Sequence, residues 1–207
     1  DQHMVDLSRV LRLLQDAGVS LKRAKCSFAA LQVKYLGFKV SHNGVEVDKE
    51  KTVSVRQALP PINKTGLRRF LGMTGFYRKF IPSYAKVAAP LTKYLKGDRD
   101  ETFELDADAL QAHEDLKFAI TSAPVLALPN KDGAFVLETD ASAAQLGVQL
   151  LQAQPDGSYR PLGYWSRHCT PPELNYSPTE REALAIVWGV KKCRPYLERT
   201  RFVVRSD

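Results

Sequence analysis

Three carboxylates are the residues whose types and spacing could do chemistry. Asp140 directly follows a β-rich run, Glu182 lies in the opening turns of an expected helix, and Asp207 ends a second β-rich run. Convergent carboxylates without matching cations suit a hard divalent ion such as Mg²⁺. The spacing predicts a metal site if the fold brings the three together. In the alternative reading Asp140 only ends a strand, Glu182 is partly exposed and Asp207 is an exposed terminus.

The elements around these carboxylates predict where they meet. Strands are expected at residues 134–139, 146–152, 160–167 and 201–206. A helix is expected before the last strand, ending near Arg194 ahead of Pro195. If the fourth strand lies parallel beside the first, Asp140 and Asp207 share one edge of the sheet. The start of the crossover helix, with Glu182, lies at that same edge.

The start of that helix is well marked. Ser177 can be the N-cap, Pro178 suits the first helical position, and Glu180 completes a capping box, so Glu180 is assigned to capping. Glu182 shares a helix face with three apolar residues, Ile186, Val190 and Cys193. Burying an unpaired charge is costly, which favours a ligand role for Glu182.

Other polar residues are given no chemical role. Glu138 is assigned to the strand face opposite Asp140, and His113 and His168 are expected on the surface. Three cysteines at irregular spacing indicate plain thiols in a reducing compartment. No apolar run reaches membrane-spanning length and the N-terminus is no signal peptide. We therefore expect an intracellular protein that is not secreted, and a piece of a longer chain.

Upstream of residue 130 the pattern is mainly helical. Helices are expected at 4–17, 67–80, 87–95 and 110–120, the first ended by Gly18. Residues 33–47 predict a β-hairpin closed at Asn43-Gly44, because both central positions of a two-residue hairpin turn favour φ above zero.

The positive charge of the chain is concentrated in one segment. The net charge is +7, and residues 51–96 contain ten Lys and Arg residues without any Asp or Glu. The stretch after Gly97 is net acidic, which indicates a boundary there. A segment with positive and no negative side chains predicts binding to the phosphates of nucleic acid, although charge alone is weak evidence for such binding.

The motifs around the carboxylates resemble the ribonuclease H domain of gypsy-type long-terminal-repeat retrotransposons. Residues 138–142, Glu-Thr-Asp-Ala-Ser, with Gly147 are similar to its first catalytic motif. Residues 175–185 resemble its second motif, and residues 194–197 and 203–207 the approach to its third. In the same family's reverse transcriptase, the thumb helix is similar to residues 67–81, the primer-grip hairpin to 35–38, and the connector to 122–126. The resemblance covers nearly the whole chain in the family's order.

The resemblance implies roles for particular residues. Asp140, Glu182 and Asp207 would be three of four carboxylates that bind two Mg²⁺ ions, one activating water and the other stabilising the leaving oxygen of the RNA strand. Contacts with a primer–template or RNA–DNA duplex are expected from Tyr35, Leu36, Gly37, Phe38, Lys64, Arg68, Arg69, Gly72, Phe76, Arg78 and Lys79. Core packing remains the alternative for Phe76, and is favoured for Phe70. Arg68 and Arg69 could instead be merely solvated.

The implied fold is α+β / α/β. It comprises the C-terminal part of a reverse-transcriptase palm, a helical thumb, and a truncated RNase H-like mixed-sheet domain. The expected domains are a palm helix with the primer-grip hairpin (1–50), a basic thumb (51–97), a connection (98–130) and the RNase H-like domain (131–207). The sequence also departs from the family, because the polymerase Asp pair and the fourth nuclease carboxylate are absent, and Phe103-Glu104-Leu105 replaces the usual connector tryptophan.

Two functions follow from these observations. The first is a fragment of a Pol polyprotein whose parent enzyme copies RNA into DNA and degrades the RNA strand with two Mg²⁺ ions. Its partners are a duplex and the rest of the polyprotein. The second is a retroelement-derived, catalytically incomplete binding or scaffold subunit of a larger assembly. An unrelated fold that imitates the motifs is a distant third.

Overall fold

The computed structural model describes residues 2–97 and 102–206, so Asp207 lies outside the described residues. The chain divides into two compact units, residues 1–33 and 34–207. The first unit contains helix α1 (Gln2–Asp16) and a 3₁₀ turn, η1 (Arg23–Lys25). Gly18 follows α1 with φ +70°, and the Val19 N–H donates to the Leu14 carbonyl at 2.9 Å. The predicted helix and its glycine stop are confirmed.

A small sheet of order β1-β2-β3 contains the predicted hairpin, with two corrections. Strands β2 (Phe38–Ser41) and β3 (Gly44–Val47) are antiparallel, and Ser41 is the partner of Gly44, so the loop is His42-Asn43 rather than Asn43-Gly44. A Cβ at Gly44 would lie 2.1 Å from the Leu126 carbonyl oxygen. Close approach of a second chain segment therefore requires this glycine. The β-rich run 33–40 is also not continuous, because a turn separates β1 (Gln32–Tyr35) from β2.

Four α-helices and two 3₁₀ turns follow the small sheet among the described residues and form what we call the helical part (49–121). They are α2 (Lys49–Arg56), α3 (Lys64–Phe76), η2 (Arg78–Phe80), α4 (Tyr84–Thr92), η3 (Lys93–Leu95) and α5 (Ala107–Thr121). The predicted helix 67–80 is thus an α-helix followed by a 3₁₀ turn. Helix α2 was not predicted. Its N-cap is Asp48, whose carboxylate accepts from the Glu50 N–H at 3.2 Å.

The core of the helical part buries Leu67, Phe70, Phe80, Leu91 and Leu116. Phe70 is 2% exposed, as expected for a core residue. His113 was expected on the surface, and that expectation is wrong: its side chain is fully buried. The imidazole ring lies 4.3 Å from the Phe70 ring, centroid to centroid. Positions 109, 112, 113, 116 and 120 of α5 form one buried stripe, and His113 belongs to it.

The second sheet has the strand order β6-β5-β4-β7. Strands β4 (Phe135–Ala141), β5 (Gln145–Ala153) and β6 (Tyr159–His168) form the predicted antiparallel meander. Strand β7 (Phe202–Ser206) lies parallel to β4, with Phe135 opposite Phe202 and Thr139 opposite Ser206. The mixed sheet and its parallel fourth strand are as predicted. Asp140 lies inside β4 rather than after it.

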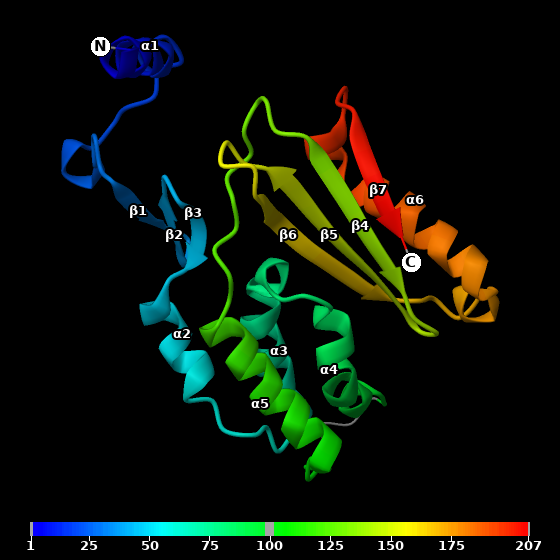
Figure 1. The fold of residues 1–207 in the computed structure, drawn as a ribbon. Helices are drawn as coiled ribbons and strands as arrows, with labels where there is room; N and C mark the ends of the chain where they lie inside the picture. The colour runs from blue at the N-terminus through cyan, green and yellow to red at the C-terminus, as the bar shows by residue number, and fades with distance from the viewer. Residues whose placement is uncertain (1, 98–101, 207) are drawn as a thin grey trace. The chain divides into compact units, whose positions relative to one another are not determined.

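Helix α6 (Pro178–Leu197) connects β6 to β7 and covers one face of this sheet (Figure 1). Its capping box is present, with Ser177 as N-cap and Glu180 at the third helical position. The helix continues through Pro195, beyond its predicted end near Arg194. Leu197 is 4% exposed and packs in the same core cluster as Cys193, and this burial offsets the one hydrogen bond that proline removes from the last turn.

The two faces of the sheet correct one assignment. A Cβ added at Gly189 of α6 would lie 3.0 Å from a Val148 methyl and 3.4 Å from Leu137 Cδ2, so α6 packs on the face of Leu137. Side chains two apart in a strand share a face. Glu138 and Asp140 therefore lie on one face together, opposite α6. The assignment of Glu138 to the face away from Asp140 is wrong.

The three cysteines are free thiols, as expected. Burial raises the pKa of Cys193 to about 12. In the described part of the chain no helix is both long and apolar enough to cross a membrane.

Candidate nucleic-acid interface and carboxylate pocket

One face of α3 is open to solvent and carries three residues of different character, which we call the α3 strip. Arg68, Gly72 and Phe76 follow one another at steps of four and therefore share a face. All three are exposed, and Phe76 is 52% exposed. A Cβ at Gly72 would meet no atom within 4 Å. The strip thus offers a cation, a stretch of bare backbone and an aromatic ring in a row.

The α3 strip continues into the turn before β2. The Phe38 and Phe76 rings stack at 5.1 Å between centroids, with 13° between their planes. A Cβ at Gly37 would lie 3.1 Å from the Tyr77 hydroxyl and 3.4 Å from Phe76 Cε1. Leu36 and Gly37 have φ of +47° and +81°, a turn conformation that suits glycine. Leu36 is 68% exposed beside the strip.

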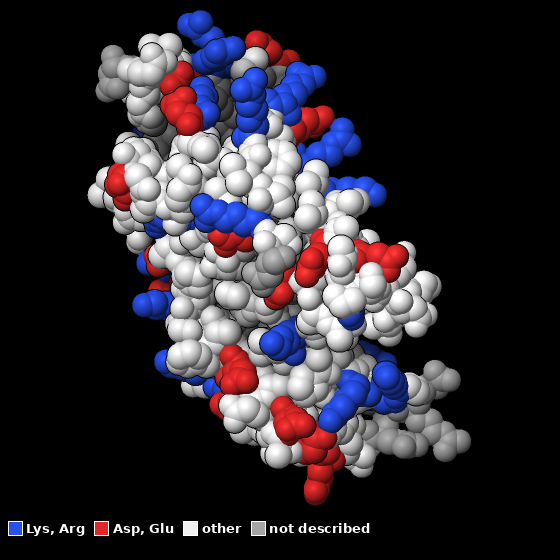
Figure 2. Space-filling model, turned by 45° about the vertical axis from the view of Figure 1, so that its right-hand side comes forward, with Lys and Arg blue, Asp and Glu red and all other residues white. Residues whose placement is uncertain are grey.

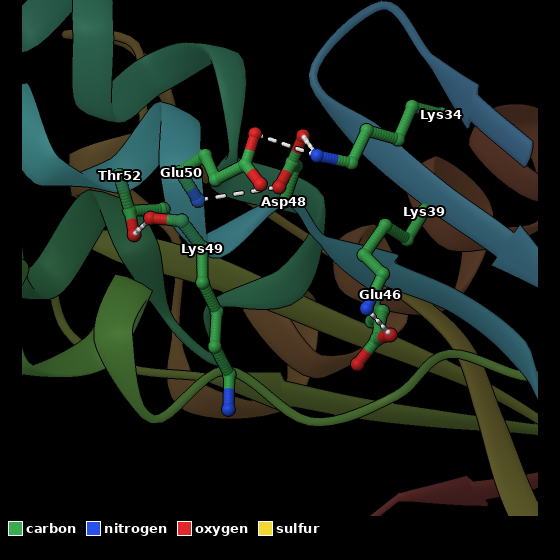
Figure 3. A network of polar contacts seen from close by, with 7 residues as sticks. All are labelled: Lys34, Lys39, Glu46, Asp48, Lys49, Glu50 and Thr52. Atoms are coloured by element: carbon green, nitrogen blue, oxygen red, sulfur yellow. Dashed lines mark hydrogen bonds and ion pairs between the residues drawn. The ribbon is translucent and has the colours of Figure 1, made fainter.

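A polar network holds this turn (Figure 3). Asp48 is 4% exposed, and its backbone N–H donates to the Gly37 carbonyl at 3.0 Å. Lys34 Nζ lies 2.6 Å from a Glu50 carboxylate oxygen and 3.7 Å from one of Asp48. The hydrogen bond to Glu50 raises the pKa of Lys34. The N-cap of α2 therefore also fixes the turn at Gly37.

Three of the five predicted phosphate-binding cations are engaged within the chain. Lys64 is 8% exposed and donates to the Gly97 carbonyl at 2.9 Å. An Arg78 N–H donates to the Ser166 carbonyl at 2.6 Å. Lys79 lies 4.6 Å from the Phe38 ring centroid, and burial lowers its pKa. Arg68, Arg69 and Arg78 are all exposed, and Arg78 keeps further N–H donors besides the one given to Ser166. Lys64 and Lys79 are therefore the two of the five that are least open to a ligand.

Charge is not gathered into one uniform field on the face that Figure 2 presents. Lys and Arg side chains alternate there with Asp and Glu. The binding of phosphates by the basic run 51–96 stays a prediction. The α3 strip is better defined, because steps of four residues place Arg68, Gly72 and Phe76 on one face of a single helix.

A polar pocket of about 500 Å³ lies where the second sheet meets the loop before α4. We call it the carboxylate pocket. Its lining residues are Pro82, Ser83, Glu138, Thr139, Asp140, Gly147, Val148, Gln149, Tyr164, Arg205 and Ser206. Asp140 is exposed there. A Cβ at Gly147 would lie 3.9 Å from Asp140 Cβ and 3.9 Å from Ser83 Oγ, so Gly147 separates the two side chains without filling the space.

The three predicted carboxylates are only partly brought together. Glu182 is half-buried in the second turn of α6, one turn before Ala185, which packs with Leu146. It does not line the carboxylate pocket. Asp207 lies outside the described residues, and its neighbour Ser206 lines the pocket. The residues 2–97 and 102–206 contain no group of three or more His, Cys, Asp or Glu side chains able to hold a metal.

A cross-strand ion pair lies in the same pocket. Arg205 is the register partner of Glu138 across β4 and β7. An Arg205 N–H donates to a Glu138 carboxylate oxygen at 3.2 Å. Burial raises the pKa of Tyr164, and the Glu138 charge raises it further. A guanidinium, two carboxylates and a phenol thus face the pocket together.

Ser166 joins the second sheet to the helical part. Its carbonyl accepts from Arg78, and its hydroxyl accepts from the Ala85 N–H at 2.9 Å. Ser83, two residues before Ala85, has φ +49° and makes no side-chain cap bond with α4. These contacts fix Ser83 at the rim of the carboxylate pocket.

Sequence reasoning missed Ser83, Tyr164 and Arg205 as pocket residues. Ser83 and Tyr164 come from segments far from the carboxylate motifs, so no local pattern connects them. Arg205 could have been found, because it precedes Asp207 by two residues and two-residue spacing places side chains on one strand face.

Comparison with known proteins places this architecture in a family. Residues 105–204 match the family of the RNase H-like domain found in reverse transcriptase. The chain is 38% identical over 206 residues to the retrovirus-related Pol polyprotein from transposon opus of Drosophila melanogaster, covering 95% of this chain and 20% of that protein. It is 36% identical over 199 residues to the transposon Tf2-3 polyprotein of Schizosaccharomyces pombe, covering 96% of this chain and 15% of that protein. The chain thus spans a fifth or less of the length of these relatives.

Two solved structures have the same fold. The foamy viral protease-reverse transcriptase in complex with RNA/DNA hybrid aligns with a TM-score of 0.83 at 20% identity, covering 99% of this chain and 28% of that one. The same viral protein in complex with dsDNA aligns with a TM-score of 0.81 at 20% identity, covering 100% of this chain and 43% of that one. The likeness spans the helical part and both sheets. The chain belongs to the reverse-transcriptase and RNase H-like region of gypsy-type long-terminal-repeat retrotransposon Pol polyproteins.

Proposed function

We propose that this chain binds an RNA–DNA or primer–template duplex along the α3 strip and the Leu36-Gly37 turn. The observation that carries the proposal is the exposed row Arg68, Gly72 and Phe76, which continues into that turn through the Phe38–Phe76 stack. In this proposal residues 1–50 end a palm, 51–97 form a thumb, 98–130 a connection and 131–207 the RNase H-like domain.

The chemistry of the strip suits a duplex. The Arg68 guanidinium can donate to phosphate oxygens. Gly72 leaves the helix backbone uncovered, so a ligand can approach it more closely than it could approach any other residue type. Phe76 and Leu36 present apolar surface that can contact sugars or bases. A strip of this kind reads shape and backbone rather than sequence.

We further propose that Asp140 and Glu182 are ligands for Mg²⁺, together with Asp207. Carboxylates are the hard oxygen donors that Mg²⁺ takes. Asp140 is exposed and Glu182 is half-buried, and within the described residues neither is in an ion pair. In this respect the residues fit the metal. When bound, such ions would activate water and stabilise a leaving oxygen. Asp140 would bind Mg²⁺ from the carboxylate pocket, which it lines, and Glu182 would bind it from α6, outside that lining.

The parent polyprotein would copy RNA into DNA and degrade the RNA strand. The alternative is a catalytically incomplete binding subunit that keeps only the duplex surface. Both functions need the α3 strip, and they differ in whether the carboxylates bind metal.

A titration with matched variants tests the duplex proposal. We expect a fluorescent RNA–DNA hybrid to bind the 207-residue chain, with affinity falling roughly tenfold or more between about 50 and 200 mM salt. Phe76→Ala should weaken binding. Phe118→Ala is the control, because Phe118 is a phenylalanine of α5 outside the strip that is more exposed than Phe76, 72% against 52%. Equal affinities for the two variants would refute the proposed surface.

A further inference from the structure

Arg205 combines a fixed position with unused hydrogen-bonding capacity. Among residues 2–97 and 102–206 its guanidinium makes one hydrogen bond, to Glu138 at 3.2 Å. Its Cζ lies 5.9 Å from the centroid of the Tyr159 ring, within the range of a cation–π contact. An arginine has five N–H donors along its edges. The Arg205 side chain is 58% exposed, so the remaining edge is open to the carboxylate pocket.

The Glu138–Arg205 pair sets where that open edge points. The two residues are direct partners across β4 and β7. Glu138 shares its strand face with Asp140, two residues further along. The guanidinium is therefore anchored on the strand that carries Asp140, inside the same pocket.

Stability alone does not account for this pair. Its carboxylate and guanidinium side chains are 36% and 58% exposed. Ion pairs this exposed contribute little to folding, because water screens them and two long side chains must be ordered. The carboxylates of Glu138 and Asp140 in this pocket would repel an incoming phosphate. Arg205 places a positive charge beside them.

We propose that Arg205 is a contact for a backbone phosphate of the nucleic-acid strand that enters the carboxylate pocket, and that Glu138 is its positioning residue. The inference rests on the proposed duplex binding. A guanidinium with free edge donors is the side chain best suited to phosphate oxygens. The hydroxyl of Ser83 and the amide of Gln149 line the same pocket and complete a polar surround.

The test compares salt dependence of binding in Arg205→Gln, Arg205→Lys and Glu138→Gln. A labelled RNA–DNA hybrid is titrated in EDTA, so that no metal-dependent cleavage enters the readout. Losing one phosphate contact should lower the slope of log affinity against log salt by about 0.9. We expect Arg205→Gln to show that loss and weaker binding. Arg205→Lys should keep the slope, because it keeps the charge.

Glu138→Gln separates a ligand contact from a structural pair. The glutamine side-chain oxygen can still accept the Arg205 N–H and so keep the guanidinium in position, while the neighbouring negative charge is removed. Binding should therefore be at least as tight as in the unchanged chain. Arg194→Gln is the matched control, since Arg194 forms an exposed pair with Glu198 at 3.1 Å outside the pocket, and its slope should not change. Thermal unfolding of each variant verifies the fold.

Two results would overturn the inference. One is an unchanged slope in Arg205→Gln while the unchanged chain binds the hybrid. The other is equal weakening by Glu138→Gln and Arg205→Gln, which would mean that the pair only supports the sheet. Failure of the unchanged chain to bind at all would instead refute the duplex proposal, so the two failures are distinguishable.

Discussion

Gly72→Leu should stabilise the protein and at the same time weaken its binding to a duplex. The position is an exposed site inside α3, where an added Cβ meets no atom within 4 Å. Glycine costs a helix interior about 1 kcal/mol relative to alanine, and leucine is close to alanine. The substitution should therefore raise the free energy of unfolding by about 0.7 kcal/mol, and the melting temperature by about 2 °C.

Binding should change in the opposite direction. A leucine side chain would occupy the space through which the proposed ligand reaches the backbone of the α3 strip. We expect the dissociation constant for an RNA–DNA hybrid to rise at least tenfold, equivalent to about 1.4 kcal/mol. Fluorescence anisotropy measures the affinity, and thermal unfolding measures the stability.

Gly75→Ala is the internal control for this experiment. Gly75 lies in the same helix, and its added methyl would lie 3.6 Å from the Tyr84 hydroxyl of α4, whereas one at Gly72 would meet no atom within 4 Å. It should stabilise the fold without weakening binding. If Gly72→Leu raised the melting temperature and left the affinity unchanged, the α3 strip would not be the interface.

Three other substitutions test separate features. Burial lowers the pKa of His113 below its ordinary 6.5, so the unfolded chain binds the proton more readily than the folded protein does. The free energy of unfolding should therefore fall as the pH drops through 6.5, by up to about 1.4 kcal/mol per pH unit. In denaturant titrations His113→Leu should remove that pH dependence. Thr139 is 6% exposed and its hydroxyl has no hydrogen-bond partner among the described residues. Thr139→Val should therefore raise the free energy of unfolding by about 1 kcal/mol. A lower free energy of unfolding would mean that the hydroxyl has a partner. In gel assays with Mg²⁺ or Mn²⁺ we expect the 207-residue chain by itself to cleave RNA–DNA hybrids poorly, because it holds three of the four carboxylates that the family resemblance implies. Robust cleavage abolished by Asp140→Asn would contradict that expectation.

The sequence predicted what depends on local pattern. The capping box at Ser177 and Glu180, the meander of β4 to β6 and the glycine stop after α1 follow from short-range rules, and the structure has them. The error at His113 came from long-range packing, whereas the face of Glu138 followed from two-residue alternation within its own strand and was misassigned. His113 looked isolated in the sequence, and it is buried by packing against other elements, including the Phe70 ring of α3.

The candidate site shows the same division. Asp140 was recognisable from its motif, and its roles in metal binding and catalysis stay a prediction. The wall of its pocket was not recognisable, because Ser83 reaches it from another segment of the chain. Lys64 was misleading for a related reason: its position in a basic run suggested a ligand contact, whereas its side chain is buried against the Gly97 carbonyl.

The junction at Ser166 bears on how such modules can be exchanged during evolution. One residue of β6 accepts from Arg78 through its carbonyl and from the Ala85 N–H through its hydroxyl. A recombination event that replaced the sheet alone could restore the first bond with any residue, because every residue has a carbonyl. The second needs a small hydroxyl side chain at that position, since otherwise the Ala85 amide would be buried without an acceptor. Exchange should therefore succeed most readily when the helical segment and the sheet are inherited together.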